Sequence, residues 1–214
     1  MKQLKNATFV FQQKYMGYSN YKSLRQALER LNLEETDLDL FSDVPPSEPS
    51  PWLKQTLEIG KSMPLTNEKS KSERVISPIL MEVINYYKAD FTLYSGADLY
   101  IDDKQDLSGA CDFVIAKHPR KQIMQAPIIS LAEAKDQDMD YGQGQCLAQM
   151  YAAQVYNAQR GKPQPYIYGC AVTGGEWKFL KLAENQVCID TESYYLSDLP
   201  KILGILHHVI QSYL

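Results

Sequence analysis

The sequence predicts an α/β protein in which a mixed β-sheet is flanked by helices. Segments with helical and with strand-like periodicity follow one another in the order helix, three strands, helix, two strands, helix. One strand-like run, residues 128–132, is almost continuously apolar, which is typical of a central strand buried on both faces. A proline-rich segment at residues 43–51 separates this body from the preceding part of the chain.

Length and composition agree with an ordinary globular protein. The 214 residues are 44% hydrophobic and 22% charged, which suits one domain with a full core. No apolar stretch is long enough to cross a bilayer, and the N-terminus lacks a signal-peptide pattern, so we expect a cytoplasmic protein without a membrane partner. The net charge of −4 argues against a large basic surface for nucleic acid, although a local basic patch can still contact phosphates.

The first sixty residues have the pattern of a helical extension. Residues 19–33 carry apolar side chains at helical spacing, namely Tyr21, Leu24, Ala27, Leu28 and Leu31. Four prolines in residues 43–51 cannot continue a helix, and residues 52–61 favour a second short helix. We therefore expect residues 1–60 to form a helical N-terminal extension with a stiff linker, and residues 61–214 to form the main domain.

The main domain begins with a predicted helix over residues 67–87. Its apolar arc consists of Val75, Ile76, Ile79, Leu80, Val83, Ile84 and Tyr87. At about 100° per residue, Glu73 falls inside this arc and Glu82 falls just outside it. A carboxylate on a buried face needs a partner, for which a metal ion is one candidate; the alternative is that Glu73 lies in a frayed first turn. Pro78 leaves open a kink or a later helix start.

Strands and helices alternate in the rest of the chain. Periodicity predicts strands at residues 91–101, 110–117, 127–135, 166–172 and 176–182, with a short sixth strand at 187–190. It also predicts a long helix at residues 139–160 and a closing helix at 197–214.

Two short motifs place charged side chains on consecutive strands. Gly109-Ala110-Cys111-Asp112 precedes an apolar run, and Glu133-Ala134-Lys135 ends the next strand. Side chains alternate between the faces of a strand, so Glu133 and Lys135 point the same way. If the two strands are neighbours, Asp112 and Glu133 can converge on one Mg²⁺ ion, which prefers carboxylate and water oxygens.

This combination indicates hydrolysis of a phosphodiester. A bound metal ion neutralises phosphate charge and activates a water molecule, and Lys135 can orient or deprotonate that water and stabilise the developing negative charge. The alternative for Glu133 and Lys135 is a surface salt bridge on an edge strand. The apolar strand before them and the nearby Asp112 favour the hydrolytic site.

On these residues the chain resembles the PD-(D/E)XK nuclease superfamily, which has a restriction-endonuclease-like fold. The resemblance covers roughly residues 67–182 and is closest to uncharacterised bacterial members. It implies an αβββαβ core in which Asp112 and Glu133 bind the metal ion and Lys135 assists the water. The residue before Asp112 is Cys111, where the family often has proline.

The resemblance implies further site residues. The backbone carbonyl of Ala134 would add a metal ligand. The glutamate of the first helix would be Glu73, also as a metal ligand, with Glu82 as the second choice. Exonuclease-like branches carry a glutamine and a tyrosine on the following helix, for which the candidates are Gln145, Gln149 and Tyr151.

The predicted function is Mg²⁺-dependent DNA cleavage, with Mn²⁺ as a substitute metal. The alternative is a nuclease-fold protein that binds nucleic acid or a protein partner without cleaving. A third hypothesis is a structural or regulatory subunit that docks through its N-terminal helices. The form of the DNA, the choice between end and internal cleavage, and homo-oligomer formation stay open.

Overall fold

The computed structural model describes residues 17–135, 137–173 and 175–214. Within them, eight strands form one mixed sheet in the order β1-β7-β6-β5-β4-β3-β2, and β8 pairs with β6. The strands are β1 (Glu34–Leu38), β2 (Thr92–Asp102), β3 (Leu107–Ala116), β4 (Ile128–Lys135), β5 (Ile167–Thr173), β6 (Glu176–Ala183), β7 (Gln186–Asp190) and β8 (Tyr194–Tyr195). The helices are α1 (Leu24–Leu31), α2 (Pro51–Lys61), α3 (Glu68–Lys71), α4 (Ser77–Tyr87), α5 (Met139–Gln159) and α6 (Leu199–Gln211). The predicted α/β class with a mixed sheet between helices is confirmed.

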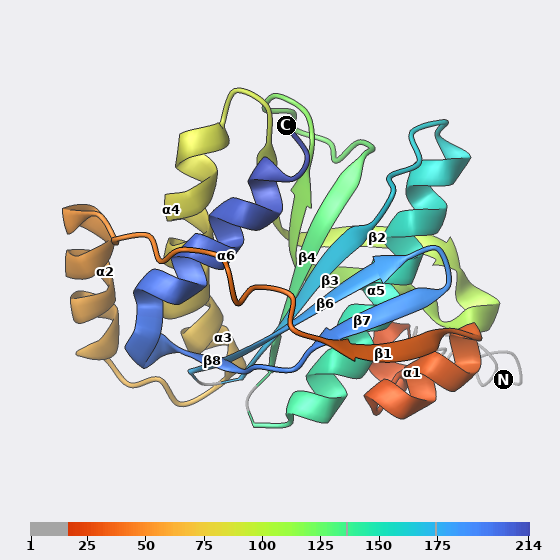
Figure 1. The fold of residues 1–214 in the computed structure, drawn as a ribbon, viewed down its shortest axis with the longest axis horizontal. Helices are drawn as coiled ribbons and strands as arrows, with labels where there is room; N and C mark the ends of the chain where they lie inside the picture. Colours follow the sequence, from red (N-terminus) through yellow and green to blue (C-terminus); the bar gives the residue numbers. More distant parts are fainter. Residues whose placement is uncertain (1–16, 136, 174) are drawn as a thin grey trace, which may run out of the picture.

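The helices cover the two faces of the sheet in separate layers (Figure 1). One core contains buried residues of α2, α4 and α6, and the other contains those of α1 and α5. Strands β4 and β5 are parallel neighbours. A parallel pair needs a crossover connection, which α5 supplies on its face of the sheet.

The sequence predicted a purely helical N-terminal part, but the structure contains a strand there. Strand β1 pairs in parallel with β7 at the edge of the sheet. All five of its residues are exposed. Because four of the five are polar, the segment has no apolar alternation that would indicate a strand. Helix α1 packs on α5 through a face that includes Ala27, Leu28 and Leu31. Residues 1–16 of the predicted extension lie outside the described residues.

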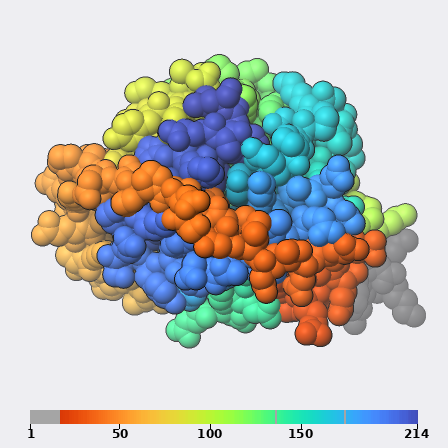
Figure 2. All heavy atoms as spheres, in the orientation of Figure 1, coloured from red at the N-terminus to blue at the C-terminus, as the bar shows by residue number. Residues whose placement is uncertain are grey.

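The proline-rich segment packs against the body of the protein (Figure 2). The Ser47 N–H donates to the Pro200 carbonyl, and the Lys201 ammonium donates to the Phe41 and Val44 carbonyls. A side chain at Gly204 would collide with the Pro45 carbonyl, so the segment lies directly on α6. The predicted linker therefore has a fixed path across this face.

The predicted helix at residues 67–87 has an irregular middle. Asn67 caps α3, and a wide π-helical turn, η2 (Ser72–Ile76), separates α3 from α4. The regular α-helix thus restarts at Ser77, with Pro78 in its first turn, where a missing N–H is tolerated.

The later predictions of two helices and six strands are confirmed within a few residues, and β8 is an additional short strand. Within the described ranges, no helix combines the length and the apolar character that a bilayer crossing demands.

Asn157 fixes α5 to the beginning of β4. Its side-chain amide is fully buried, accepts from the Ile128 N–H at 2.8 Å and donates to the Ile128 carbonyl at 2.7 Å. We expect Asn157→Ala to lower the free energy of unfolding by about 3 kcal/mol, because it leaves two buried backbone groups unpaired. Urea denaturation measures this loss. The control Asn85→Ala, on the exposed face of α4, should change stability by less than about 0.5 kcal/mol; equal effects would contradict the assignment.

Candidate active site

Antiparallel pairing of β3 and β4 brings Asp112 and Glu133 together. Phe113 pairs with Ala132, so Asp112 and Glu133 occupy the next facing positions, and facing side chains project to the same side of a sheet. The Ala134 N–H donates to Asp112 Oδ2 at 2.8 Å. We call Asp112, Glu133 and Lys135 the carboxylate–lysine cluster.

Glu133 lies in the interior and both of its oxygens are engaged. Its side chain points to the sheet face that α5 covers, and the residue is 4% exposed. Oε1 lies 2.7 Å from the Lys135 ammonium, and Oε2 accepts from the Gln149 amide at 2.7 Å. The glutamate is therefore oriented by one neighbour on its own strand and one on α5.

Lys135 joins the cluster to α3. Its ammonium lies 3.7 Å from Glu68 Oε2 on α3 and 5.5 Å from the centre of the Tyr141 ring. A Cβ added at Gly142 would lie 3.2 Å from Lys135 Cγ, so this glycine lets α5 approach the lysine closely. Burial alone would lower the pKa of Lys135, but Glu133 and Glu68 outweigh burial and raise it. The amine therefore stays charged.

Burial raises the pKa of both carboxyl groups of the cluster. Burial raises the pKa of Glu133 to about 7, and the neighbouring Asp112 adds to the rise, while Lys135 and Gln149 oppose it. Burial also raises the pKa of Asp112, against the Ala134 N–H and Lys135, which lower it. One buried and one half-buried carboxylate near one ammonium leave an excess of negative charge, which favours a proton or a metal cation at this point.

The structure does not place Glu73 on the buried arc, so that expectation is wrong. The side chain is 60% exposed and pairs at 3.8 Å with Lys69 of its own helical segment. The π turn explains the error, because its extra residue rotates everything before it relative to α4. Glu68, which the sequence analysis did not identify, is the acid of this segment that reaches Lys135.

Glu82, the second choice, is buried but has a structural role. The backbone N–H and the hydroxyl of Ser50 donate to its two carboxylate oxygens at 2.8 and 2.9 Å. Ser50 in turn caps α2. These contacts tie the start of α2 to α4 and lie on the opposite sheet face from α5.

The two predicted glutamines share one buried side of α5. Gln145 is 4% exposed and Gln149 is 1% exposed, and they lie one helical turn apart. Among the described residues, neither Gln145 Oε1 nor Gln149 Oε1 has a hydrogen-bond partner. Tyr151, the third candidate, is half-buried and packs against the α1–α5 core.

The donor set of the cluster fits a magnesium ion. Within the described part of the chain, no three His, Cys, Asp or Glu side chains gather into a cation site. Mg²⁺ is commonly held by only one or two carboxylates, with water and substrate phosphate as further ligands. Each carboxylate oxygen has two lone pairs, so Asp112 and Glu133 can bind a cation while keeping their hydrogen bonds. The two orphan amide oxygens on α5 suit the hydrogens of bound water.

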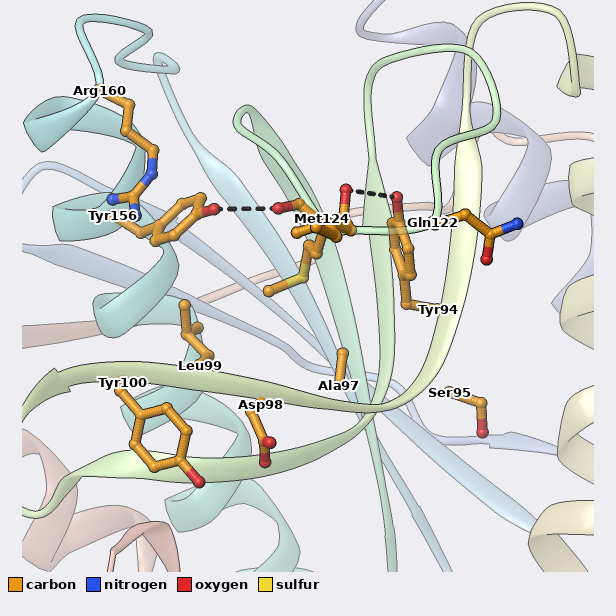
Figure 3. Close-up of a pocket in the computed structure, with 11 residues that line it drawn as sticks. Tyr94, Ser95, Ala97, Asp98, Leu99, Tyr100, Gln122, Met124, Tyr156 and Arg160 are labelled. Carbon is orange, nitrogen blue, oxygen red and sulfur yellow. Dashed lines mark hydrogen bonds between the residues drawn. The ribbon is translucent and has the colours of Figure 1, made fainter.

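A separate pocket of about 570 Å³ opens along β2 (Figure 3). Its lining includes Tyr94, Tyr156 and Arg160, whose guanidinium lies 3.6 Å from the Tyr156 ring centre. The Tyr156 hydroxyl donates to the Met124 carbonyl. The pocket contains none of the cluster residues, and Asp98 is the one carboxylate in its lining, so the pocket is separate from the carboxylate–lysine cluster.

No protein-family model and no curated protein matches this chain. The function is therefore inferred from the carboxylate–lysine cluster and its surroundings.

Proposed function

We propose that this chain is a Mg²⁺-dependent nuclease that hydrolyses phosphodiester bonds in DNA. The observation that carries the proposal is the convergence of Asp112, Glu133 and Lys135 at the point where the pairing of β3 with β4 ends. The order α4-β2-β3-β4-α5-β5 supports it, because it has the αβββαβ sequence of elements of a restriction-endonuclease-like core. We therefore propose membership of the PD-(D/E)XK superfamily.

Each residue of the cluster has a role in this reaction. Asp112 and Glu133 would hold Mg²⁺, with Mn²⁺ as a substitute and the Ala134 carbonyl as an additional ligand. The bound ion supplies charge neutralisation and a more acidic water. Lys135 stays charged beside Glu133, orients the attacking water and stabilises the negative charge that develops on the phosphate. Gln149 holds the Glu133 carboxylate, and the Ala134 N–H holds that of Asp112.

Cleavage of plasmid, linear and single-stranded DNA in Mg²⁺ or Mn²⁺ tests the proposal. We expect wild-type cleavage that EDTA abolishes, and a loss of at least about 100-fold in Glu133→Gln and Lys135→Ala. If the wild type binds DNA but cleaves none of the three substrates, the enzyme proposal is wrong and the chain is a catalytically silent binding protein. Equal activity in wild type and both variants would show that the cleavage does not come from this site.

Glu68 and Glu73 form a matched pair of variants. Glu68→Gln removes a negative charge 3.7 Å from the Lys135 ammonium, so we expect kcat/KM to change about two- to fivefold. Glu73→Gln should leave kcat/KM within error, because Glu73 is exposed and pairs with Lys69. Steady-state cleavage kinetics distinguish the two. A large loss of kcat/KM in Glu73→Gln but not in Glu68→Gln would contradict this assignment and show that Glu73 belongs to the active site.

The pKa of Glu133 predicts how stability depends on pH. Its folded value of about 7 exceeds its ordinary value of 4.5, so the folded chain holds more protons between these values. The stabilisation is present below about pH 4.5 and is lost as the pH rises to about 7. With EDTA present, we expect the Tm of Glu133→Gln relative to that of wild type to rise between pH 5 and pH 8. Mg²⁺ at pH 8 should raise the Tm of wild type more than that of the variant. An unchanged Tm difference across this range would refute the shift.

A further inference from the structure

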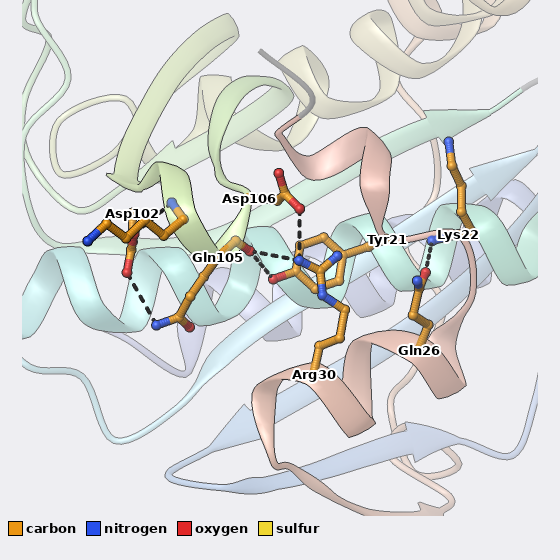
Figure 4. A network of polar contacts seen from close by, with 8 residues as sticks. Tyr21, Lys22, Gln26, Arg30, Asp102, Gln105 and Asp106 are labelled. Carbon is orange, nitrogen blue, oxygen red and sulfur yellow. Dashed lines mark hydrogen bonds and ion pairs between the residues drawn. The ribbon is translucent and has the colours of Figure 1, made fainter. Parts of the chain in front are cut away.

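The segment at residues 18–24, which leads into the first residue of α1, is fixed to the β2–β3 hairpin (Figure 4). The Tyr21 hydroxyl donates to the Gln105 carbonyl at 2.7 Å. Arg30 lies over the Tyr21 ring at 4.2 Å and forms an ion pair of 2.8 Å with Asp106. Figure 4 shows Lys22 at the end of this network, with its side chain extending away from Arg30 and Asp106.

The same segment also lies directly on the first turns of α5. The Leu24 N–H donates to Asp140 Oδ1 at 2.9 Å, and the Tyr141 hydroxyl donates to the Ser19 carbonyl at 3.1 Å. A Cβ added at Gly144 would lie 2.5 Å from the Ser23 carbonyl oxygen, so only glycine allows this approach. These contacts hold the segment beside the carboxylate–lysine cluster.

Tyr141 connects Lys22 to that cluster. The Lys22 ammonium lies 3.4 Å from the Tyr141 hydroxyl and 4.9 Å from the ring centre, and the Lys135 ammonium lies 5.5 Å from the same centre. Among the described residues, carboxylates pair with Lys135 but none lies within ion-pair distance of Lys22. Lys22 is exposed, so its charge is available to an anion outside the protein.

We propose that Lys22 binds a phosphate of the substrate strand next to the phosphate that is cleaved. This inference rests on the proposed nuclease function and makes the N-terminal segment a wall of its active site. A strand that approaches Asp112, Glu133 and Glu68 meets negative charge, and Lys22 is a cation at that entrance without a carboxylate partner among the described residues. The Tyr141 ring holds the ammonium in place by a cation–π interaction.

Binding at a series of salt concentrations tests the proposal. Fluorescence anisotropy would follow labelled single-stranded and duplex DNA on full-length protein carrying Glu133→Gln, which is expected to bind without cleaving. Lys22→Ala should weaken binding about three- to tenfold. It should also reduce the slope of log K against log salt by about 0.7 for single strands or 0.9 for duplex, the value for one lost phosphate contact. Lys22→Arg should restore affinity and slope.

The matched control is Lys54→Ala, which removes an exposed lysine from α2, over the other face of the sheet. Its affinity and slope should equal those of the parent. Wild-type cleavage combined with an unchanged slope in Lys22→Ala would overturn the role of Lys22 and leave the nuclease proposal standing. A loss of binding that Lys22→Arg does not restore would also overturn it. A wild-type chain that neither binds nor cleaves DNA would overturn both proposals.

Discussion

The attachment of α5 to β4 is the constraint on which the site depends. Two amide side chains make it: Asn157 pairs with both backbone groups of Ile128, and Gln149 donates to Glu133. A buried polar group without a hydrogen-bond partner destabilises the folded chain. Because sliding α5 along the strand would break these bonds, it is unfavourable. The same helix carries Gln145, Tyr141 and Gly142, and its register on β4 therefore sets the position of each of them relative to the cluster.

The cluster is electrostatically costly for the folded chain. Glu133 and Asp112 are both removed from water and repel one another, and burial raises the pKa of each. Lys135 compensates for only part of this charge, because it is shared between Glu133 and Glu68. Groups perturbed in this way concentrate at functional sites, where a ligand of opposite charge removes the penalty. A divalent cation between the two carboxylates would have that effect.

Much of the fold and part of the site could be predicted because they follow from local periodicity. Alternation along a strand places Glu133 and Lys135 on one face, and helical spacing places Gln145 and Gln149 together. The failures came from features without a local signal. The π turn changed the helical phase that had placed Glu73 on the buried arc, and β1 is an exposed edge strand defined by its backbone pairing with β7. The contacts of Glu68 and Lys22 join distant segments, which periodicity cannot detect.

The glycines at the start of α5 let the N-terminal segment pack close to the carboxylate–lysine cluster. Glycine inside a helix costs up to about 1 kcal/mol relative to alanine, yet Gly142 and Gly144 both occupy the first turns of α5. A Cβ at Gly142 would press on Lys135, and one at Gly144 would overlap the backbone at Ser23. Glycine at these two positions thus lowers the stability of the helix but allows the end of β4 and the N-terminal segment to approach α5. The contact at Gly144 thus fixes the segment that carries Lys22, and the proposed phosphate contact of Lys22 depends on this packing.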